Sequence, residues 1–369
     1  MVDLSSQYLR LKDEIDAAVQ DVFKSAAFIN GDAVKTFCER LSAYLNVPYV
    51  IPCGNGTDAL RIALQALNIG ANHEVIIPSF TYIAPIEAIA SVGAIPVVVD
   101  VDPKTFNINP DSISRIISYR TKAIIAVHLF GQACNMKAIR EIAKKNKLEI
   151  IEDNAQSFGA SYRYSNGRTK KLGTIGKVGI TSFFPTKPLA CYGDGGAIFT
   201  SNTALSKQLQ MLVNHGQTNK YHHKIIGCNS RLDTVQAAIL NVKLKYMESF
   251  TERRVQLAER YHQALHDCPE IILPETSNYS THVYHQYTIQ VPNNKRDALK
   301  TFLAEKGIPS MIYYPLPVHK QNAYRPIALF GDIVESFRLC NEVLSLPIHS
   351  EMTDEMQTFI TDTIRQFYK

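Results

Sequence analysis

The feature that most constrains the fold is a regular alternation of apolar runs and helical periodicity in the first half of the chain. Four runs of strand length alternate with helical segments, the strands at 74–77, 95–99, 123–127 and 148–151 and the helices beginning near Pro85, Asp111 and Met136. Such alternation is typical of right-handed βαβ units, which build a mainly parallel sheet covered by helices on both faces. We therefore predict an α/β fold with functional residues at the carboxyl ends of the strands.

One lysine, Lys187, lies in the run TSFFPTKPLACYGDGGAIFT, between an aromatic-rich strand end and a glycine-dense turn. Apolar neighbours such as Phe183 and Phe184 would lower the pKa of this amine, so that a neutral amine is available to attack an aldehyde. The pattern indicates a lysine that forms a Schiff base. For a lysine considered alone, a position in a surface loop is the commoner explanation, so the prediction depends on a second feature.

That second feature is Asp153, which ends the apolar run beginning at Leu148 and is followed closely by Gln156. An acid at the carboxyl end of a buried strand faces the crevice where open α/β sheets bind ligands. If Lys187 holds pyridoxal 5′-phosphate, Asp153 can pair with the ring nitrogen and keep it protonated, and Gln156 would lie near the phenolic oxygen. A strand-end Asp alone is often a helix cap, so it is the combination with the lysine that favours the cofactor.

Other strand ends add candidate contacts. The turn Cys53–Leu60 carries glycines and enters an alanine- and leucine-rich helix, where free N–H groups favour a phosphate, although Thr57 and Asp58 are also ordinary capping residues. Tyr82 follows the next strand and either covers a planar ring or packs as a core aromatic. His128 follows another strand and is interpreted as a hydrogen-bonded structural histidine rather than a catalyst.

The length of 369 residues favours two domains, which we place at 1–245 and 246–369. The remaining predicted elements are helices at 8–23 and from 32, an exposed loop at 161–180, a strand at 195–200, a polar flap or subunit contact at 216–227, a long helical pattern at 234–266, strands at 282–291 and 310–313, and helices at 294–306, 335–344 and 353–367. The second domain is therefore a small α+β unit.

A proline-bearing run, YYPLPVH, distinguishes this second domain, because its two prolines exclude a regular helix. Its Tyr313, Tyr314 and His319 are suited to gripping a sugar or a nucleotide from a fixed loop. A packed seam between domains explains the same residues equally well.

Composition limits the class of protein. No run approaches 18 apolar residues and the start of the chain lacks the order of a signal peptide, so we expect a cytoplasmic protein that does not enter a membrane. The seven cysteines are scattered without a CxxC pair, which argues against a disulfide framework and a metal site. The formal charge of +5 is spread along the chain, which does not favour nucleic-acid binding.

Taken in order, the motifs of this chain closely resemble those of the DegT/DnrJ/EryC1/StrS family of sugar aminotransferases over nearly the full length. These motifs are Gly56-Thr57, Tyr82, Asp153 with Gln156, the run from Ser182 to Lys187, GDGGA and Asn229-Ser230-Arg231. The resemblance implies pyridoxal-phosphate fold type I, with a seven-stranded sheet and a homodimer that shares its active sites. It implies that Lys187 is the Schiff-base lysine and proton carrier and that Tyr82 stacks on the ring. The residues implied to hold the phosphate are Gly56, Thr57, Asp58, Ser182 and, from the other subunit, Asn229.

Among subfamilies, the chain most resembles the transaminases of UDP-2-acetamido-2-deoxy-3-keto-glucuronic acid, which take part in the synthesis of bacterial surface polysaccharides such as the lipopolysaccharide O-antigen. The runs that carry this resemblance are FFPTKPLACYGDGGAIFT and NSRLDTVQAAIL. The resemblance implies L-glutamate as amino donor and pyridoxamine 5′-phosphate as the cofactor form between two half-reactions. Arg231 could bind the sugar carboxylate in a bidentate way, or form an ion pair at a dimer interface. The resemblance adds Gly31, Thr186, Tyr313 and Tyr314 to the sugar-nucleotide site, although relatives often have histidine in place of Tyr313.

Three alternatives remain open from the sequence. The same cofactor frame serves transfer to C4 of a 4-keto-6-deoxy nucleotide sugar. A member of the family can also keep the cofactor and act as a regulatory protein without turnover. A Schiff-base aldolase without cofactor is the third, and it leaves the phosphate-binding turn and Asp153 without a role.

Overall fold

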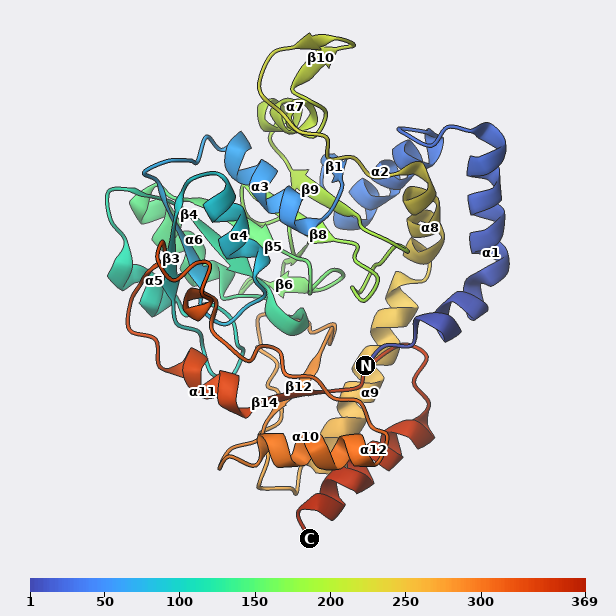
Figure 1. The fold of residues 1–369 in the computed structure, drawn as a ribbon, viewed down its shortest axis with the longest axis vertical. Coiled ribbons are helices and arrows are strands. Elements are labelled where there is room, and N and C mark those ends of the chain that lie inside the picture. The colour runs from blue at the N-terminus through green and yellow to red at the C-terminus, as the bar shows by residue number, and fades with distance from the viewer.

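The computed structural model describes residues 1–369 and is built around an eight-stranded, mainly parallel sheet (Figure 1). The order across the sheet is β1-β9-β8-β5-β4-β2-β3-β13. The strands are β1 (Tyr49–Cys53), β2 (Glu74–Pro78), β3 (Ile95–Val99), β4 (Thr121–Val127), β5 (Glu149–Asp153), β8 (Val178–Ser182), β9 (Gly196–Thr200) and β13 (Leu329–Phe330). Only β9 runs against its neighbours. The predicted fold is confirmed, and the strand beyond the seven predicted is the two-residue β13.

Both faces of the sheet are buried, because alternate residues of each strand enter different cores. In β2, Val75 and Ile77 join one core and Ile76 the other, and in β4 Ile125 and Ile124 divide in the same way. This division explains why the strands are nearly continuous apolar runs. Helices contributing to the first core are α3 (Gly56–Ala66), α4 (Ala84–Ser91) and α7 (Thr203–Leu212), and those contributing to the second are α5 (Pro110–Ile116) and α6 (Met136–Asn146).

The N-terminal helices α1 (Leu4–Ser25) and α2 (Asp32–Leu45) pack against α8 (Thr234–Leu244). The helical pattern predicted at 234–266 is two helices in the structure, because α8 ends before α9 (Met247–Leu265) begins. The N–H groups of Lys245 and Tyr246 donate to carbonyls three residues back, at 3.2 and 3.0 Å, which tightens and closes the last turn of α8. From there α9 runs toward the C-terminal layer (Figure 1).

That layer consists of α9, β12 (Tyr287–Gln290), α10 (Arg296–Glu305), β14 (Val343–Leu346) and α12 (Asp354–Phe367), with a core of its own. Two sequence predictions are wrong here. The strand predicted at 310–313 is a single bridge from Met311 to Ser345, because the chain then turns back toward the large sheet. The helix predicted to reach 344 ends at Glu342, since the next four residues pair antiparallel with β12. The strand predicted at 282–291 is shorter, at 287–290.

Between β12 and β14 the chain returns to the large sheet. Val318 N–H donates to Ser79 O at 3.0 Å, β13 pairs with β3, and α11 (Glu335–Glu342) follows. Val318, Leu339 and Val343 belong to the core of the large sheet. The domain boundary at 245/246 coincides with the break between α8 and α9, yet the C-terminal half crosses back over it, so the division into 1–245 and 246–369 stays a prediction.

Two small hairpins decorate the large sheet. The predicted loop at 161–180 contains the pair β6 (Ser161–Arg163) and β7 (Thr169–Lys171) before β8 begins. The predicted flap at 216–227 contains β10 (Gln217–Asn219) and β11 (His222–His223), and it projects from the body of the molecule (Figure 1). None of the helices has the length and apolar character needed to cross a bilayer.

Candidate active site

Lys187 lies in the tight connection between β8 and β9. Its N–H donates to Phe184 O at 2.8 Å, and Cys191 N–H donates to Phe183 O at 2.9 Å, so the segment folds back on the end of β8. The side chain is partly buried, and burial lowers the pKa of its amine. A neutral nucleophilic amine at a strand end is the property predicted for this residue.

Asp153 ends β5, the strand beside β8, where it pairs in register with Ile180. Its carboxylate is 6% exposed and accepts one hydrogen bond, from Ala155 N–H at 3.0 Å. Burial raises the pKa of Asp153, while the N–H of Ala155 and the charge of Lys187 act in the opposite direction. The charge of Asp153 likewise opposes the fall in the pKa of Lys187. The structure therefore brings the two predicted groups together on adjacent strand ends.

The start of α3 meets the end of β8 at very short range. A Cβ on Gly56 would come within 2.8 Å of Ser182 Cβ, and a Cβ on Gly196 within 2.6 Å of the Asn55 carbonyl. Asn55 caps the helix, since its side chain accepts from Asp58 N–H at 2.8 Å. The first N–H groups of α3 have no intrahelical acceptor, and those not bonded to Asn55 are available to the predicted phosphate beside the Ser182 hydroxyl.

Asp58 differs from its predicted role as a direct phosphate contact. Its carboxylate accepts from Ser230 Oγ at 2.7 Å and pairs with Arg61 at 3.0 Å, while Ser230 Oγ accepts from Gly54 N–H at 3.0 Å. Both side-chain oxygens are thus engaged within the chain. A carboxylate would also repel a phosphate, so we assign Asp58 to organising the turn.

An aromatic wall closes one side of the site. Tyr82 is 53% exposed, and its ring lies 6.2 Å from that of Tyr314, which is 5.7 Å from the ring of Tyr313. Gln156 joins this wall to the strand ends, because its Nε2 donates to Tyr314 Oη at 2.9 Å and its Oε1 accepts from Phe130 N–H at 3.0 Å. A residue of the C-terminal half therefore contacts a predicted cofactor residue of the large sheet.

The remaining predicted residues lie around α8 and the lysine turn. Thr186 precedes Lys187 and is partly buried. Gly31 is the N-cap residue of α2, and its N–H donates to Thr234 Oγ1 at 3.1 Å. Arg231 Nη1 donates to Asn214 Oδ1 at 3.2 Å, and the exposed Asn229 bridges the same Asn214 through its backbone. No hydrogen bond joins Gly31, Arg231 or Asn229 to Lys187 or Asp153, so their roles stay predictions.

The prediction that His319 contacts substrate is wrong. The imidazole is 1% exposed, its Nδ1 lies 3.1 Å from Ser79 Oγ, and its ring packs against Phe330 and Phe337. Burial lowers its pKa to about 4. The residue anchors the returning C-terminal segment to the large sheet, the alternative that the sequence left open.

Sequence reasoning missed Glu152, which lies beside Asp153 and points to the other side of the strand. Its carboxylate contacts His128 Nε2 at 2.9 Å and accepts from the N–H groups of Gly173, Ile175 and Gly176. His128 Nδ1 accepts from Cys134 N–H at 3.1 Å, so the imidazole is a neutral donor to Glu152. His128 is therefore structural, as the sequence analysis proposed. The two adjacent acids, Glu152 and Asp153, were the sequence feature from which a partner for His128 could have been predicted.

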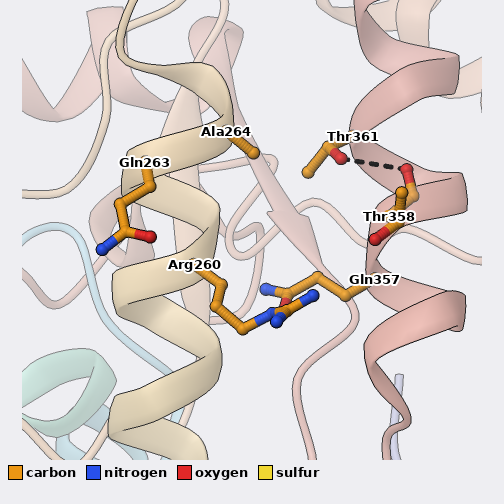
Figure 2. Close-up of a pocket in the computed structure, with 6 residues that line it drawn as sticks. All are labelled: Arg260, Gln263, Ala264, Gln357, Thr358 and Thr361. Atoms are coloured by element: carbon orange, nitrogen blue, oxygen red, sulfur yellow. Dashed lines mark hydrogen bonds between the residues drawn. The ribbon is translucent and has the colours of Figure 1, made fainter.

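A separate hollow, with a volume of about 300 Å³, lies between α9 and α12, and Figure 2 shows its lining residues. It is lined by Arg260, Gln263, Ala264, Gln357, Thr358 and Thr361. Arg260 is already bound to Asp354 and Gln357, at 2.9 and 3.0 Å. The hollow contains none of the predicted site residues. No group of three or more His, Cys, Asp or Glu side chains gathers in a way that could hold a metal ion.

The sequence matches the DegT/DnrJ/EryC1/StrS aminotransferase family over residues 9–365. The chain belongs to this family. The resemblance stated from the motifs is thereby confirmed, and so is the assignment to the aminotransferases.

Relatives in the DegT family align over almost the whole chain. A protein of Geobacillus stearothermophilus named pleiotropic regulatory protein is 44% identical over 100% of this chain and 98% of its own. The UDP-2-acetamido-2-deoxy-3-oxo-D-glucuronate aminotransferase of Pseudomonas aeruginosa is 42% identical over 94% of each chain. The dTDP-3-amino-3,6-dideoxy-alpha-D-galactopyranose transaminase of Aneurinibacillus thermoaerophilus is 40% identical over 99% and 98%.

Solved structures of the DegT family have the same fold. The aminotransferase of Brucella abortus has a TM-score of 0.94 at 41% identity, covering 99% of this chain and 98% of its own. NtdA of Bacillus subtilis, solved with bound pyridoxamine phosphate, has a TM-score of 0.88 at 32% identity, covering 96% and 81%. The family depends on pyridoxal phosphate, and the residues present fit that group: Lys187 for the aldehyde, Asp153 for the ring nitrogen, and the Gly56–Ser182 approach for the phosphate.

Proposed function

We propose that the protein is a pyridoxal-phosphate-dependent aminotransferase that moves an amino group from L-glutamate to a keto nucleotide sugar. The observation that carries this proposal is geometric: Asp153 ends β5 directly beside β8, the end of β8 leads into the turn that carries Lys187, and the start of α3 approaches Ser182 at the same place. The bound cofactor supplies an electron sink for the charge left when a carbon loses its proton. Asp153 would pair with the ring nitrogen of the bound cofactor and keep it protonated, and Gln156 holds the Tyr314 hydroxyl through its Nε2.

Lys187 serves as the proton carrier in both half-reactions. Its lowered pKa provides a neutral amine, which removes the Cα proton of glutamate as a general base. In the second half-reaction the same amine returns a proton to the sugar carbon. Thr186 and the aromatic wall of Tyr82, Tyr313 and Tyr314 confine the substrate over this amine.

We assign the amination to C3 of UDP-2-acetamido-2-deoxy-3-keto-D-glucuronic acid, in the synthesis of a bacterial surface polysaccharide such as the O-antigen. The relative from Pseudomonas aeruginosa is named for this sugar, and the relative from Aneurinibacillus thermoaerophilus is also named for a 3-amino sugar, carried on dTDP. Both names favour C3 over transfer to C4 of a 4-keto-6-deoxy sugar. Arg231, which pairs with no carboxylate of this chain, supplies a cation for the uronate group.

A regulatory protein that binds the cofactor without turnover is the second candidate. The relative from Geobacillus stearothermophilus carries a regulatory name at 44% identity, which is the observation in its favour. The intact Lys187 and Asp153 favour catalysis.

The half-reaction with L-glutamate distinguishes these candidates. Purified enzyme reconstituted with pyridoxal phosphate should lose its visible absorbance band on addition of glutamate and release 2-oxoglutarate. The converted enzyme should then regain the band with the UDP-linked 3-keto uronate, and not with a dTDP-linked 4-keto-6-deoxy sugar. No spectral change with glutamate would support the regulatory candidate, and recovery with the 4-keto sugar alone would transfer the assignment to C4.

A further inference from the structure

Arg254 is a buried cation without a carboxylate partner in the chain. It projects from α9, is 7% exposed, and takes part in no ion pair, whereas its neighbour Arg253 pairs with Asp354 at 2.9 Å. Burial lowers the pKa of Arg254 to about 10. Buried guanidinium groups are rarely left unpaired, because an uncompensated buried charge is strongly destabilising. No carboxylate of the chain neutralises Arg254, so its charge is available to an anion from outside the chain.

Arg254 also joins two segments that each carry a histidine. Its Nη1 donates to Tyr284 O at 3.2 Å and to Ile348 O at 2.8 Å, the carbonyls directly before His285 and His349. Both segments lie at the same end of the β12–β14 pair. The Nδ1 atoms of the two imidazoles are buried and have no hydrogen-bond partner. One unpaired guanidinium and two unpartnered ring nitrogens thus gather at this end of the small sheet.

This cluster borders the Lys187 centre. Val283 N–H donates to Gly131 O at 2.9 Å, and Gln286 N–H donates to Phe130 O at 3.3 Å, while Phe130 N–H is held by Gln156. A Cβ on Gly131 would come within 3.0 Å of His285 N, so the two loops are in direct contact. Burial lowers the pKa of His285, and the charges of Lys187 and Arg254 lower it further. His285 is therefore within electrostatic reach of both the lysine and the unpaired arginine.

We propose that Arg254, together with His285 and His349, forms a carboxylate-binding subsite that holds the α-carboxylate of the amino donor. The inference rests on the proposed aminotransferase function. In an amino acid the α-carboxylate and the amine share one carbon, so a donor whose amine reaches the Lys187 centre must place its carboxylate close by. A guanidinium binds a carboxylate through two parallel N–H groups, and a neutral imidazole can add a third donor. Arg231, at the start of α8, remains for the carboxylate of the sugar.

The test compares two donors that differ only in the α-carboxylate, L-glutamate and 4-aminobutyrate, in the half-reaction of the holoenzyme. In Arg254→Met, the ratio of the half-reaction rate constant to KM should fall about 30-fold or more for glutamate. The same ratio for 4-aminobutyrate should change less than about three-fold. Arg254→Lys, which keeps the charge and loses the fork, should recover part of this loss. Binding of glutarate, measured by calorimetry, should weaken in Arg254→Met without any turnover being needed. Arg253→Met is the matched control and should behave as wild type.

Three results would overturn the subsite. Equal losses with both donors would mean that Arg254 only supports the fold through Tyr284 and Ile348. Losses confined to the reverse half-reaction with the aminated uronate would mean that the subsite binds the sugar carboxylate. If Arg254→Met does not fold, His285→Phe is tested in its place, and an unchanged preference for glutamate in it would also contradict the proposal. A wild-type enzyme that reacts with neither donor would instead refute the proposed function.

Discussion

At the scale of single residues, the protein contains two lysines whose pKa is lowered by burial, and their surroundings give them different roles. Lys243 lies in α8 with its Nζ 4.8 Å from the centre of the Tyr192 ring, and burial lowers its pKa to about 8. It has no hydrogen-bond partner, and the only charge that opposes the fall in its pKa is that of the Cys191 thiol rather than a carboxylate. Lys187 has the buried Asp153 within electrostatic reach and lies at a strand end. The acid and the position, more than the lowered pKa, distinguish a cofactor lysine from a packed one.

This contrast gives the first prediction. Lys187→Ala should abolish turnover, reducing it about 10⁴-fold or more, because no other amine can carry the proton. Lys243→Met should retain activity within about three-fold. Borohydride reduction of the wild-type holoenzyme, followed by peptide mass spectrometry, should find the added mass on the peptide containing Lys187. A label on the Lys243 peptide, or full activity in Lys187→Ala, would refute the assignment.

The sequence was sufficient for residues whose role follows from a strand end, such as Lys187 and Asp153. It failed where the role depends on a partner distant in the chain. His319 is buried because Ser79 and Phe330 surround it, and Asp58 is engaged by Ser230, 172 positions away. No local pattern marks such pairs. Arg254 could not be predicted from the sequence for the same reason, because its lack of a counter-ion depends on residues that only the fold brings near it.

At the scale of elements, one carboxylate attaches the returning C-terminal segment to the large sheet. Asp100, directly after β3, is 8% exposed and accepts hydrogen bonds from the N–H groups of Val334, Glu335 and Ser336 and from Ser336 Oγ, at 2.6 to 2.8 Å. It therefore caps α11 from another part of the chain, where an acid also complements the helix dipole. Burial alone would raise the pKa of Asp100, but these hydrogen bonds hold it below its ordinary value.

The second prediction concerns this cap. Asp100→Asn replaces an acceptor with an N–H₂ group facing backbone donors, so the free energy of unfolding at pH 7 should fall by about 2–4 kcal/mol. Because the folded pKa lies below the unfolded one, the stabilisation is complete above about pH 4 and is lost as pH falls through the folded value. Urea unfolding at several pH values should show the difference between wild type and variant shrinking in acid. A difference that does not change with pH would contradict this, and the exposed Asp332→Asn serves as control.

Elements with strong periodicity were predicted well, and those made by distant pairing were not. The strand at 95–99 has the predicted limits, because apolar residues on both faces define it locally. In contrast, β14 replaces the end of a predicted helix, since Val343–Leu346 gain β12 as a partner only in the folded chain. The same holds for β13, whose two residues form a strand because β3 offers a free edge.

At the scale of the whole molecule, the site is assembled from segments far apart in sequence. The start of α3 approaches the end of β8, which lies beside the end of β5, and Gln156 links this edge directly to Tyr314 of the C-terminal half. The alternation of strands and helices was enough to predict this edge of the sheet as the site. It could not predict that the C-terminal half would reach back to complete it, because that depends on the geometry of a long crossover.

The hairpin of β10 and β11 offers the last prediction, because it leaves large apolar side chains in solvent. Tyr221 is 80% exposed and Ile226 is 95% exposed, on a segment that projects from the body and continues into Asn229 and Arg231 (Figure 1). Burying such a surface against a second copy would bring the following residues to the partner's site. We predict that the chain forms a dimer through this surface, so the double change Tyr221→Asp with Ile226→Asp should shift the molar mass measured by light scattering from twice 41.3 kDa to 41.3 kDa and reduce turnover at least ten-fold.

The matched control is Tyr119→Asp, because Tyr119 is 89% exposed but precedes β4, at the opposite ends of the strands from Lys187. It should leave both the mass and the activity unchanged. If the variant with both Tyr221→Asp and Ile226→Asp stays dimeric and fully active, the hairpin makes no contact between subunits and each chain completes its own active site. A variant that dissociates and keeps its activity would mean that the hairpin holds a dimer together but that neither chain contributes residues to the active site of the other.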